Sequence, residues 1–212
     1  MNAPCLAETT AGVVPARELL RIVPEIVGEP WSLEALAGRF VEISGGSATA
    51  ALTVVAGLIV QAQERGDLAA WIGGGHSIFF PPDFAASGID LAALPVVHAD
   101  NVTQMARAAD TLLRSGAFSL VVLDLEGRVE MPMAMQTRLV GLAKQHHTVL
   151  IGITRSLRRT AQRGSLVSLR VETERVRTAP GCFTCTWRAL KDKRQAPGWS
   201  HREICHGPDG VC

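Results

Sequence analysis

The stretch FVEISGGSATAALTVVAGLIVQAQE, residues 40–64, decides the fold of this chain. The apolar run Phe40–Ser44 predicts a strand, and the glycine pair after it predicts a tight turn. The segment from about Ala48 to Glu64 then predicts a helix. A strand that leads through a glycine turn directly into a helix is typical of an α/β fold.

The same alternation of strand and helix patterns continues toward the C-terminus. Further strands are predicted at Leu68–Ile72, Leu94–His98, Phe118–Leu125 and Val149–Ile153, with helices at Val102–Ser115 and Met133–Gln145. Beyond Thr154 the pattern changes to strands alone, at Leu166–Glu172, Phe183–Leu190 and Ser200–Cys205. We therefore expect a mostly parallel sheet flanked by helices, with an antiparallel C-terminal extension.

Length and composition fit one ordinary domain. The chain has 212 residues, of which 47% are hydrophobic, and this excludes a disordered protein. No apolar run approaches the roughly 18 residues that cross a bilayer. Residues 1–30 combine four prolines with one short helical pattern, Ala16–Ile22, and we expect them to form an extension to a single domain at 31–212. The start of the chain does not resemble a signal peptide, so we expect a cytoplasmic protein without a membrane partner.

The net charge of +1 hides an asymmetry along the chain. Residues 1–150 carry 9 basic and 15 acidic side chains, whereas residues 151–212 carry 12 basic and 5 acidic ones. A basic C-terminal third on an acidic body favours an anionic partner, either nucleic acid or an acidic protein face. A solvated basic surface explains the charge equally well.

The five cysteines raise the question of a zinc site. Cys182 and Cys185 have the spacing of a zinc ligand pair, and Cys205, His206 and Cys212 follow. Residues 183–190, however, alternate as a strand does, and positions three apart on a strand point to opposite faces. The pattern therefore argues against structural zinc.

The glycine turn lies where a P-loop would bind phosphate. That chemistry needs G-x-x-x-x-G-K-[ST], in which the lysine reaches the phosphates and the hydroxyl binds Mg²⁺. Here Gly45 is present, but Ala50 stands at the second glycine, Ala51 at the lysine and Leu52 at the hydroxyl position. The loop keeps its place in the chain and lacks its phosphate-binding side chains.

Four pieces of sequence, in order, resemble the core of the RecA recombinase family over most of residues 35–205. They are Phe40–Gly45 before the loop, Leu113–Ala117, the strand Val121–Asp124 that resembles a Walker B strand, and Leu190–Arg194, which resembles a late basic hairpin. The resemblance implies a RecA-like P-loop core.

The departures from that family are equally informative. Gly75 stands at the position of the catalytic glutamate, and Thr154-Arg155 replaces a polar pair that is typically Asn-Gln. The segments that correspond to the two DNA-binding loops are shortened to about 125–131 and 155–164. A short RecA-like chain with a degenerate P-loop resembles the ImuA family, the small accessory proteins of inducible bacterial mutagenesis. More remotely, it is similar to the SulA-like division inhibitors.

This resemblance implies three groups of candidate residues. The first is a vestigial nucleotide site without catalytic residues, cofactor or metal: Gly45, Ala51, Leu52, Gly75 and Asp124. Asp124 alone is then expected to be a structural carboxylate. The second is an arginine cluster that fits DNA phosphates, a protein partner or solvent: Arg155, Arg158, Arg159 and Arg163. The third is a face for docking a RecA-like partner, or else an exposed hairpin: Lys191, Lys193 and Arg194.

The expected function is that of a non-catalytic accessory protein in an SOS-type DNA damage response. The resemblance implies contacts with RecA or with a translesion polymerase assembly, a nucleoid location, weak binding of single-stranded DNA, and a monomer or small oligomer. The alternatives are a SulA-like cell-division inhibitor and a nucleotide-binding enzyme with an unconventional site.

Overall fold

A computed structural model describes residues 31–46, 49–125, 131–154, 166–179 and 181–206 of the chain. The expected extension at 1–30 lies outside these residues. The described strands are β1 Phe40–Gly45, β2 Leu68–Gly73, β3 Val96–His98, β4 Phe118–Leu125, β5 Val149–Thr154, β6 Leu169–Ala179, β7 Cys182–Asp192 and β8 Ser200–His206. The described helices are α2 Leu33–Leu36, α3 Ala51–Glu64, α4 Pro81–Ala86, the short 3₁₀ helix η1 Leu91–Ala93, α5 Val102–Ser115 and α6 Met133–Gln145.

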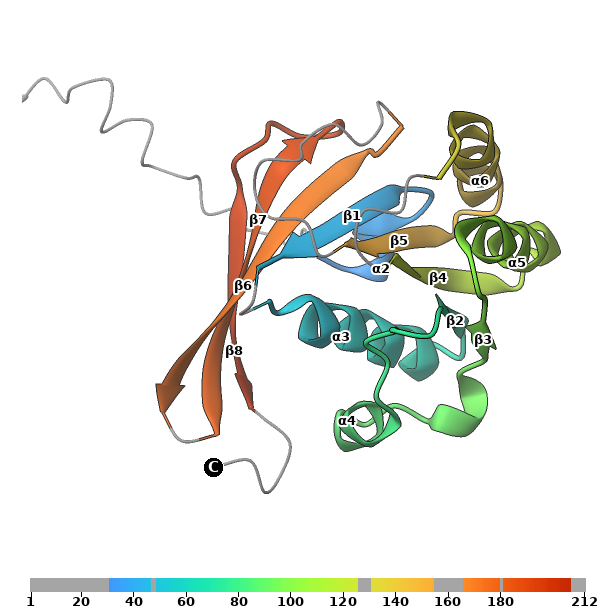
Figure 1. Ribbon diagram of the computed structural model, residues 1–212. Coiled ribbons are helices and arrows are strands. Elements are labelled where there is room, and N and C mark those ends of the chain that lie inside the picture. The colour runs from blue at the N-terminus through green and yellow to red at the C-terminus, as the bar shows by residue number, and fades with distance from the viewer. Residues whose placement is uncertain (1–30, 47–48, 126–130, 155–165, 180, 207–212) are drawn as a thin grey trace, which may run out of the picture.

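All eight strands belong to one sheet in the order β3-β2-β4-β5-β1-β6-β7-β8 (Figure 1). Strands β1 to β5 pair in parallel, and β6 joins β1 in parallel. Strands β7 and β8 then add in the antiparallel sense. The structure confirms the α/β class, the mostly parallel sheet and the antiparallel C-terminal extension.

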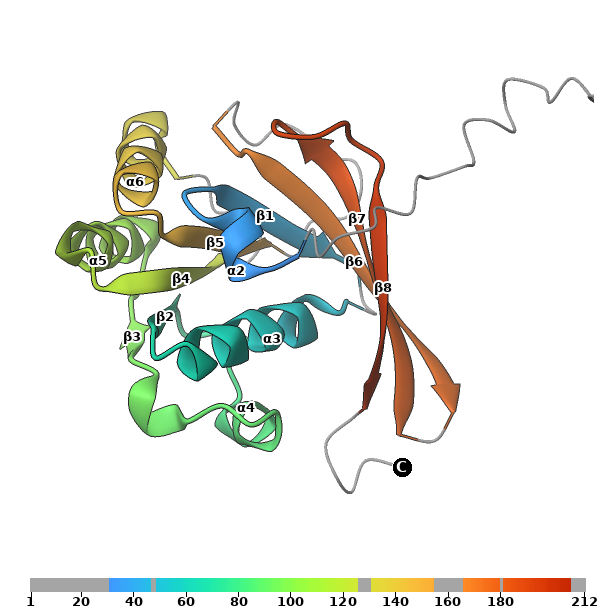
Figure 2. The ribbon, with the colours of Figure 1, turned by 180° about the vertical axis from the view of Figure 1, so that it is seen from behind.

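Helices cover the parallel part of the sheet on both faces. Figures 1 and 2 show α2, α3 and α4 on one face and α5 with α6 on the other. The central strand β4 supplies Leu120 and Val122 to the core under α3, and Val121 and Leu123 to the core under α5 and α6. Burial on both faces explains why this strand reads as one continuous apolar run.

Helix α5 has the bounds that its sequence predicts because both ends are capped. The Asn101 side chain accepts a 3.0 Å hydrogen bond from the backbone N–H of Gln104. Gly116 ends the helix at a φ of 68°, and a Cβ at this position would lie 2.8 Å from Nδ1 of His146. A glycine is therefore needed at this position for two separate reasons.

The C-terminal strands extend further than their sequence predicts. Strand β6 was expected to end at Glu172 and continues to Ala179, paired with β7 through Cys182. Its second half is mostly polar, with Val176 as its one large apolar side chain, so no apolar alternation marks it. Together with β7 and β8 it forms a three-stranded projection at the bottom left of Figure 1, which we call the arm. The arm comprises residues 174–179, 182–186 and 202–206.

Among the described residues, no helix has the length and apolar character needed to span a membrane.

Candidate functional site

The side chain of Thr49 occupies the turn between β1 and α3. Its hydroxyl accepts a 3.1 Å hydrogen bond from the backbone N–H of Ala51 and lies 2.9 Å from the hydroxyl of Thr173 on β6. A Cβ at Gly45 would lie only 2.2 Å from Thr49 Oγ1, so the first glycine of the loop makes room for this threonine. One N–H that a phosphate would use at a helix N-terminus therefore already has a partner within the chain.

The lysine and hydroxyl positions of the loop are occupied by two apolar residues, Ala51 and Leu52. Ala51 is 2% exposed and belongs to the core under α3, where Leu52 packs against it, partly buried. A lysine and a hydroxyl would be needed here to neutralise phosphate charge and to hold Mg²⁺. The helix instead contributes these two positions to the core.

Asp124, at the end of β4, is held by donors of the chain itself. Its Oδ2 atom accepts 2.6 Å hydrogen bonds from the Ser77 hydroxyl and from the backbone N–H of Ile78. Ser77 in turn accepts hydrogen bonds from the Trp71 indole and from the Phe79 N–H, both at 3.2 Å. Asp124 is 3% exposed, and its contacts with Ser77 and Ile78 tie the end of β4 to the segment between β2 and α4.

Gly75 lies in that same segment and is exposed, with open space where a Cβ would point. A glutamate side chain would therefore fit at this position without a clash. Packing therefore does not require a glycine at this position.

Ser77 is the residue of this site that sequence reasoning missed. It follows a run of three glycines and a histidine, and no motif marks it. Its importance comes from contact with Asp124, 47 positions away in sequence.

A second buried carboxylate lies on β1. Glu42 is 6% exposed and binds the Arg170 guanidinium of β6 through Oε2, at 2.9 and 3.1 Å. The hydroxyl of Thr154, the first residue of the degenerate polar pair, lies 3.4 Å from Glu42 Oε1. Glu42 on β1 thus contacts side chains of both neighbouring strands, Thr154 of β5 and Arg170 of β6.

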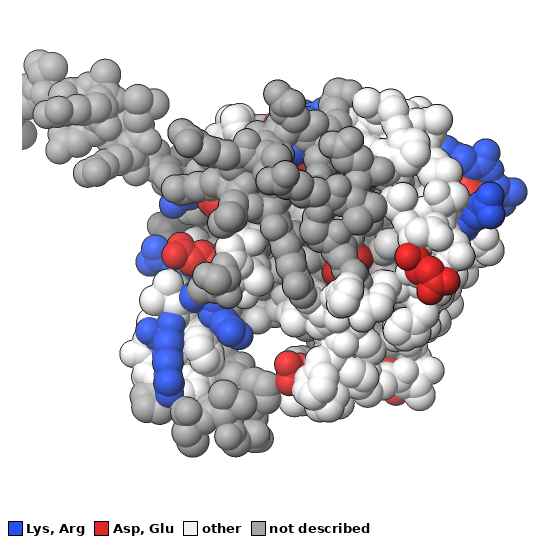
Figure 3. All heavy atoms as spheres, in the orientation of Figure 1, with Lys and Arg blue, Asp and Glu red and all other residues white. Residues whose placement is uncertain are grey.

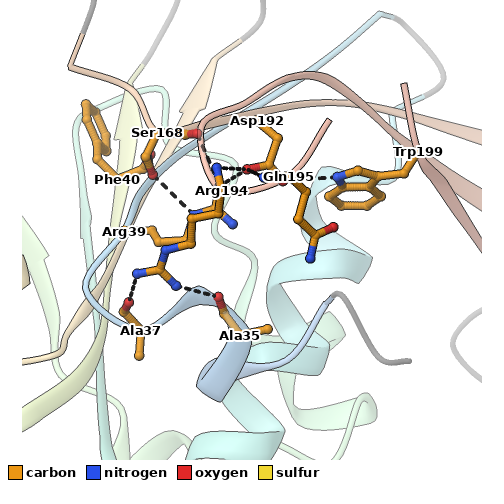
Figure 4. Close-up of polar contacts among 9 residues, drawn as sticks. All are labelled: Ala35, Ala37, Arg39, Phe40, Ser168, Asp192, Arg194, Gln195 and Trp199. Atoms are coloured by element: carbon orange, nitrogen blue, oxygen red, sulfur yellow. Dashed lines mark hydrogen bonds and ion pairs between the residues drawn. The ribbon is translucent and has the colours of Figure 1, made fainter. Parts of the chain in front are cut away.

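The three residues of the expected docking face differ in their surroundings. The Arg194 guanidinium donates to the carbonyl oxygens of Ala35 and Ala37, at 3.1 and 2.9 Å, and so caps the end of α2 (Figure 4). Lys193 is exposed and Lys191 is half-buried. Burial lowers the pKa of Lys191, and the neighbouring Lys193 and Arg170 lower it further. Arg194 thus contributes to the fold through its contacts with α2.

Asp192, between the two lysines, anchors this hairpin to the body. Its side chain is 1% exposed and accepts hydrogen bonds from Arg39 at 2.5 Å, from the Trp199 indole at 3.0 Å and from the Arg194 N–H at 2.9 Å (Figure 4). Burial alone would raise the pKa of Asp192, but these donors outweigh it and hold the pKa below its usual value.

The four clustered arginines, Arg155, Arg158, Arg159 and Arg163, lie outside the described residues, as does the shortened segment 126–130. Cys182 and Cys185 both lie on β7, which contains the strand predicted from the alternation of residues 183–190. In the described part of the chain, no three His, Cys, Asp or Glu side chains gather in a way that could hold a metal ion.

A cleft of about 720 Å³ separates the arm from the body. Figure 3 shows the hollow between the lower part of the arm and the helices beside it. Its lining comes from three places: Leu52, Thr53, Ala56, Gly57 and Val60 on α3, Asp83, Phe84, Ala86 and Ser87 around α4, and Arg175, Phe183, Glu203 and Cys205 on the arm. The Arg175 guanidinium stacks on the Phe183 ring at 4.8 Å.

Comparison with known proteins gives one family. The profile of the RecA N-terminal domain matches residues 34–163. The protein RecA of Kineococcus radiotolerans is 40% identical over 88 residues, which are 41% of this chain and 25% of that protein. The protein RecA of Corynebacterium diphtheriae is also 40% identical over 88 residues, 23% of its length. The aligned part thus spans about a quarter of the curated relatives.

Proposed function

Because the chain belongs to the RecA N-terminal domain family, we propose that it is a non-catalytic RecA-like accessory protein of the DNA damage response. It acts through contacts with other proteins and does not hydrolyse ATP. The observation that carries this proposal is that a buried Ala51 and a partly buried Leu52 occupy the two positions that a P-loop ATPase needs for charge and metal.

Three catalytic contributions are missing together. Ala51 removes the cation that neutralises phosphate, Leu52 removes the metal ligand, and Gly75 removes the base that activates water. Losing a single preorganised electrostatic group typically costs about 3–4 kcal/mol of transition-state stabilisation. With all three groups missing, we do not expect this site to accelerate ATP hydrolysis.

The likeness to the ImuA family supplies the finer proposal. We place the protein in SOS-type translesion synthesis on the nucleoid, where it binds RecA or a translesion polymerase assembly. Lys191 and Lys193 on the β7–β8 hairpin are the proposed contact, because the hairpin is held rigidly by Asp192 and presents both lysines beside it. A fixed basic face of this kind favours fast association with an acidic partner at low salt.

Single-stranded DNA is a second proposed partner, through Arg155, Arg158, Arg159 and Arg163. If about three phosphates are neutralised, log K should fall against log salt with a slope near −2. Mobility shifts that are unchanged when all four arginines are replaced by alanine would remove this contact.

Two measurements test the proposal. Calorimetric titration with Mg-ATP should show no binding, and a phosphate-release assay should show no turnover, with a RecA protein as the positive control. ATP turnover that disappears in Asp124→Ala would refute the non-catalytic function.

Binding to purified RecA and to the polymerase accessory subunit tests the partner. The double reversal Lys191→Glu/Lys193→Glu should abolish binding. The matched control is Arg65→Glu/Arg107→Glu, which makes the same charge change at exposed positions elsewhere in the domain. No binding to either protein at micromolar concentration would end the partner proposal.

A further inference from the structure

The two edges of the sheet differ in how well they are protected. At one edge β3 has only three residues, and such short edge strands resist pairing with other chains. At the other edge β8 has seven residues and pairs with β7 without any register shift. A long regular edge strand offers its free backbone N–H and C=O groups to another strand.

The sequence of β8 protects this edge only in part, since the charged residues Arg202 and Glu203 stand beside an exposed apolar residue. The strand Ser200–His206 contains no proline and no lysine. Near its middle, Ile204 is 71% exposed, the largest exposed fraction among the large hydrophobic side chains of the described residues. An exposed apolar side chain on an edge strand favours pairing with another strand.

Ile204 is also the end of a row of β-branched side chains that crosses the arm. It lies opposite Thr184 of β7, which lies opposite Val176 of β6, and Val176 is 52% exposed. Directly opposite residues share one face of the sheet, so these three side chains form a continuous strip that runs to the edge. The strip ends at β8, the edge strand of the sheet, where an added strand would extend it.

A second copy of this chain is the occupant that fits. In a two-fold antiparallel pairing of β8 with itself, facing residues share a side of the sheet. A centre at Arg202 would bring two arginines together, and a centre at Glu203 would bring two glutamates together. A centre at Ile204 brings two isoleucines together and places Glu203 opposite the partner's Cys205.

We propose that two copies of this protein pair through β8, antiparallel and centred on Ile204. The pairing joins the two strips of β-branched side chains into one and continues the sheet from one subunit into the other. Cross-strand pairs of β-branched side chains stabilise such a sheet. Because a single strand pair is smaller than a standard protein interface, we expect micromolar affinity.

Sedimentation of the full chain under reducing conditions, from about 1 to 200 μM, tests the pairing. The parent protein should shift from monomer to dimer, and Ile204→Lys should remain monomeric or weaken the dimer at least about tenfold. Val96→Lys is the control, because Val96 is an exposed apolar residue on the opposite edge strand. Circular dichroism confirms that each variant is folded. A parent protein that stays monomeric, or a dimer unchanged by Ile204→Lys, overturns the proposal.

Cross-linking tests the register. Ile204→Cys would face its own copy across the two-fold axis, so oxidation by diamide should give a covalent dimer on a non-reducing gel. Arg202→Cys lies on the same face of the same strand and would face His206, so it should cross-link no more than the parent chain. Equal cross-linking of both variants, or of neither above the parent, contradicts this register. If β8 instead pairs with a strand of another protein, the purified parent chain would stay monomeric in sedimentation. The Ile204→Cys variant would then give no covalent dimer above the parent chain.

Discussion

The Ser77 hydroxyl donates a 2.6 Å hydrogen bond to Oδ2 of Asp124, and the same oxygen accepts the Ile78 N–H at 2.6 Å. In a P-loop enzyme the carboxylate at the end of this strand serves the metal. Here protein donors hold it and the carboxylate fixes the segment after β2. The residue therefore contributes to folding, and its removal should be visible in stability.

We expect Ser77→Ala to lower the free energy of unfolding by about 1–3 kcal/mol, because it leaves a buried carboxylate short of a donor. Urea unfolding measures this. Ser87→Ala is the matched control, since its hydroxyl donates to a backbone carbonyl on the surface and its loss should cost less than about 0.5 kcal/mol. Equal losses in the two variants would contradict a structural role for Asp124.

Ala51→Lys should destabilise the protein without creating activity. Ala51 is 2% exposed, so a lysine must either bury its charge or push the start of α3 away from the core. We expect a loss of more than about 2 kcal/mol. Thermal unfolding and phosphate release measure the two effects.

Gly75→Glu provides the contrast, because open space surrounds that position. Its stability should stay within about 0.5 kcal/mol of the parent, again without turnover. ATP hydrolysis by either single variant would show that the site is closer to an active one than its contacts indicate.

The elements that sequence predicted best are those with a local explanation. Helix α5 has a cap at Asn101 and a stop at Gly116, and strand β4 has the apolar run 120–123 at its centre, so neighbouring residues define both. The second half of β6 was missed because its partner strand, and not its own pattern, makes it a strand.

The polar contacts of the site could not be predicted for the same reason. Thr49 meets Thr173, and Arg39 meets Asp192, across 124 and 153 positions of sequence. Sequence reasoning identified Asp124, Ala51 and Leu52 through their places in a motif. It had no means of identifying Ser77, which matters only through the fold.

Arg39 and Asp192 form a buried pair, with side chains 5% and 1% exposed. Arg39→Met leaves the carboxylate without its main charged partner, and we expect a loss of about 3–5 kcal/mol. The double variant Arg39→Met/Asp192→Leu should be less destabilised than Arg39→Met, because no buried charge remains unpaired. A double-mutant cycle by urea unfolding checks this order, and an additive loss would contradict it.

The carboxylate of Asp192 also makes the stability of the fold depend on pH in the acid range. The pKa of Asp192 is lower in the folded protein than in the unfolded chain, so its stabilising contribution is present above the unfolded pKa of about 4. That contribution is lost as the pH falls through the folded pKa. Between pH 6 and pH 3 the parent should therefore lose more stability than Asp192→Asn. Parallel curves for the two proteins would contradict the assignment.

Cys205 on the arm makes the stability of the fold depend on pH in the alkaline range. Burial, a hydrogen bond with Cys185 and the nearby Glu203 raise the pKa of the Cys205 thiol to about 12. Because the thiolate is the nucleophile, iodoacetamide at pH 8 should modify Cys205 far more slowly in the folded protein than in urea. The folded state also holds this proton above the unfolded pKa of about 8.5, so stability should fall as the pH rises from there toward 12. Between pH 8 and pH 10 the parent should lose more stability than Cys205→Ala. Equal losses, or rapid labelling of the folded protein, would contradict a thiol that stays protonated in the fold.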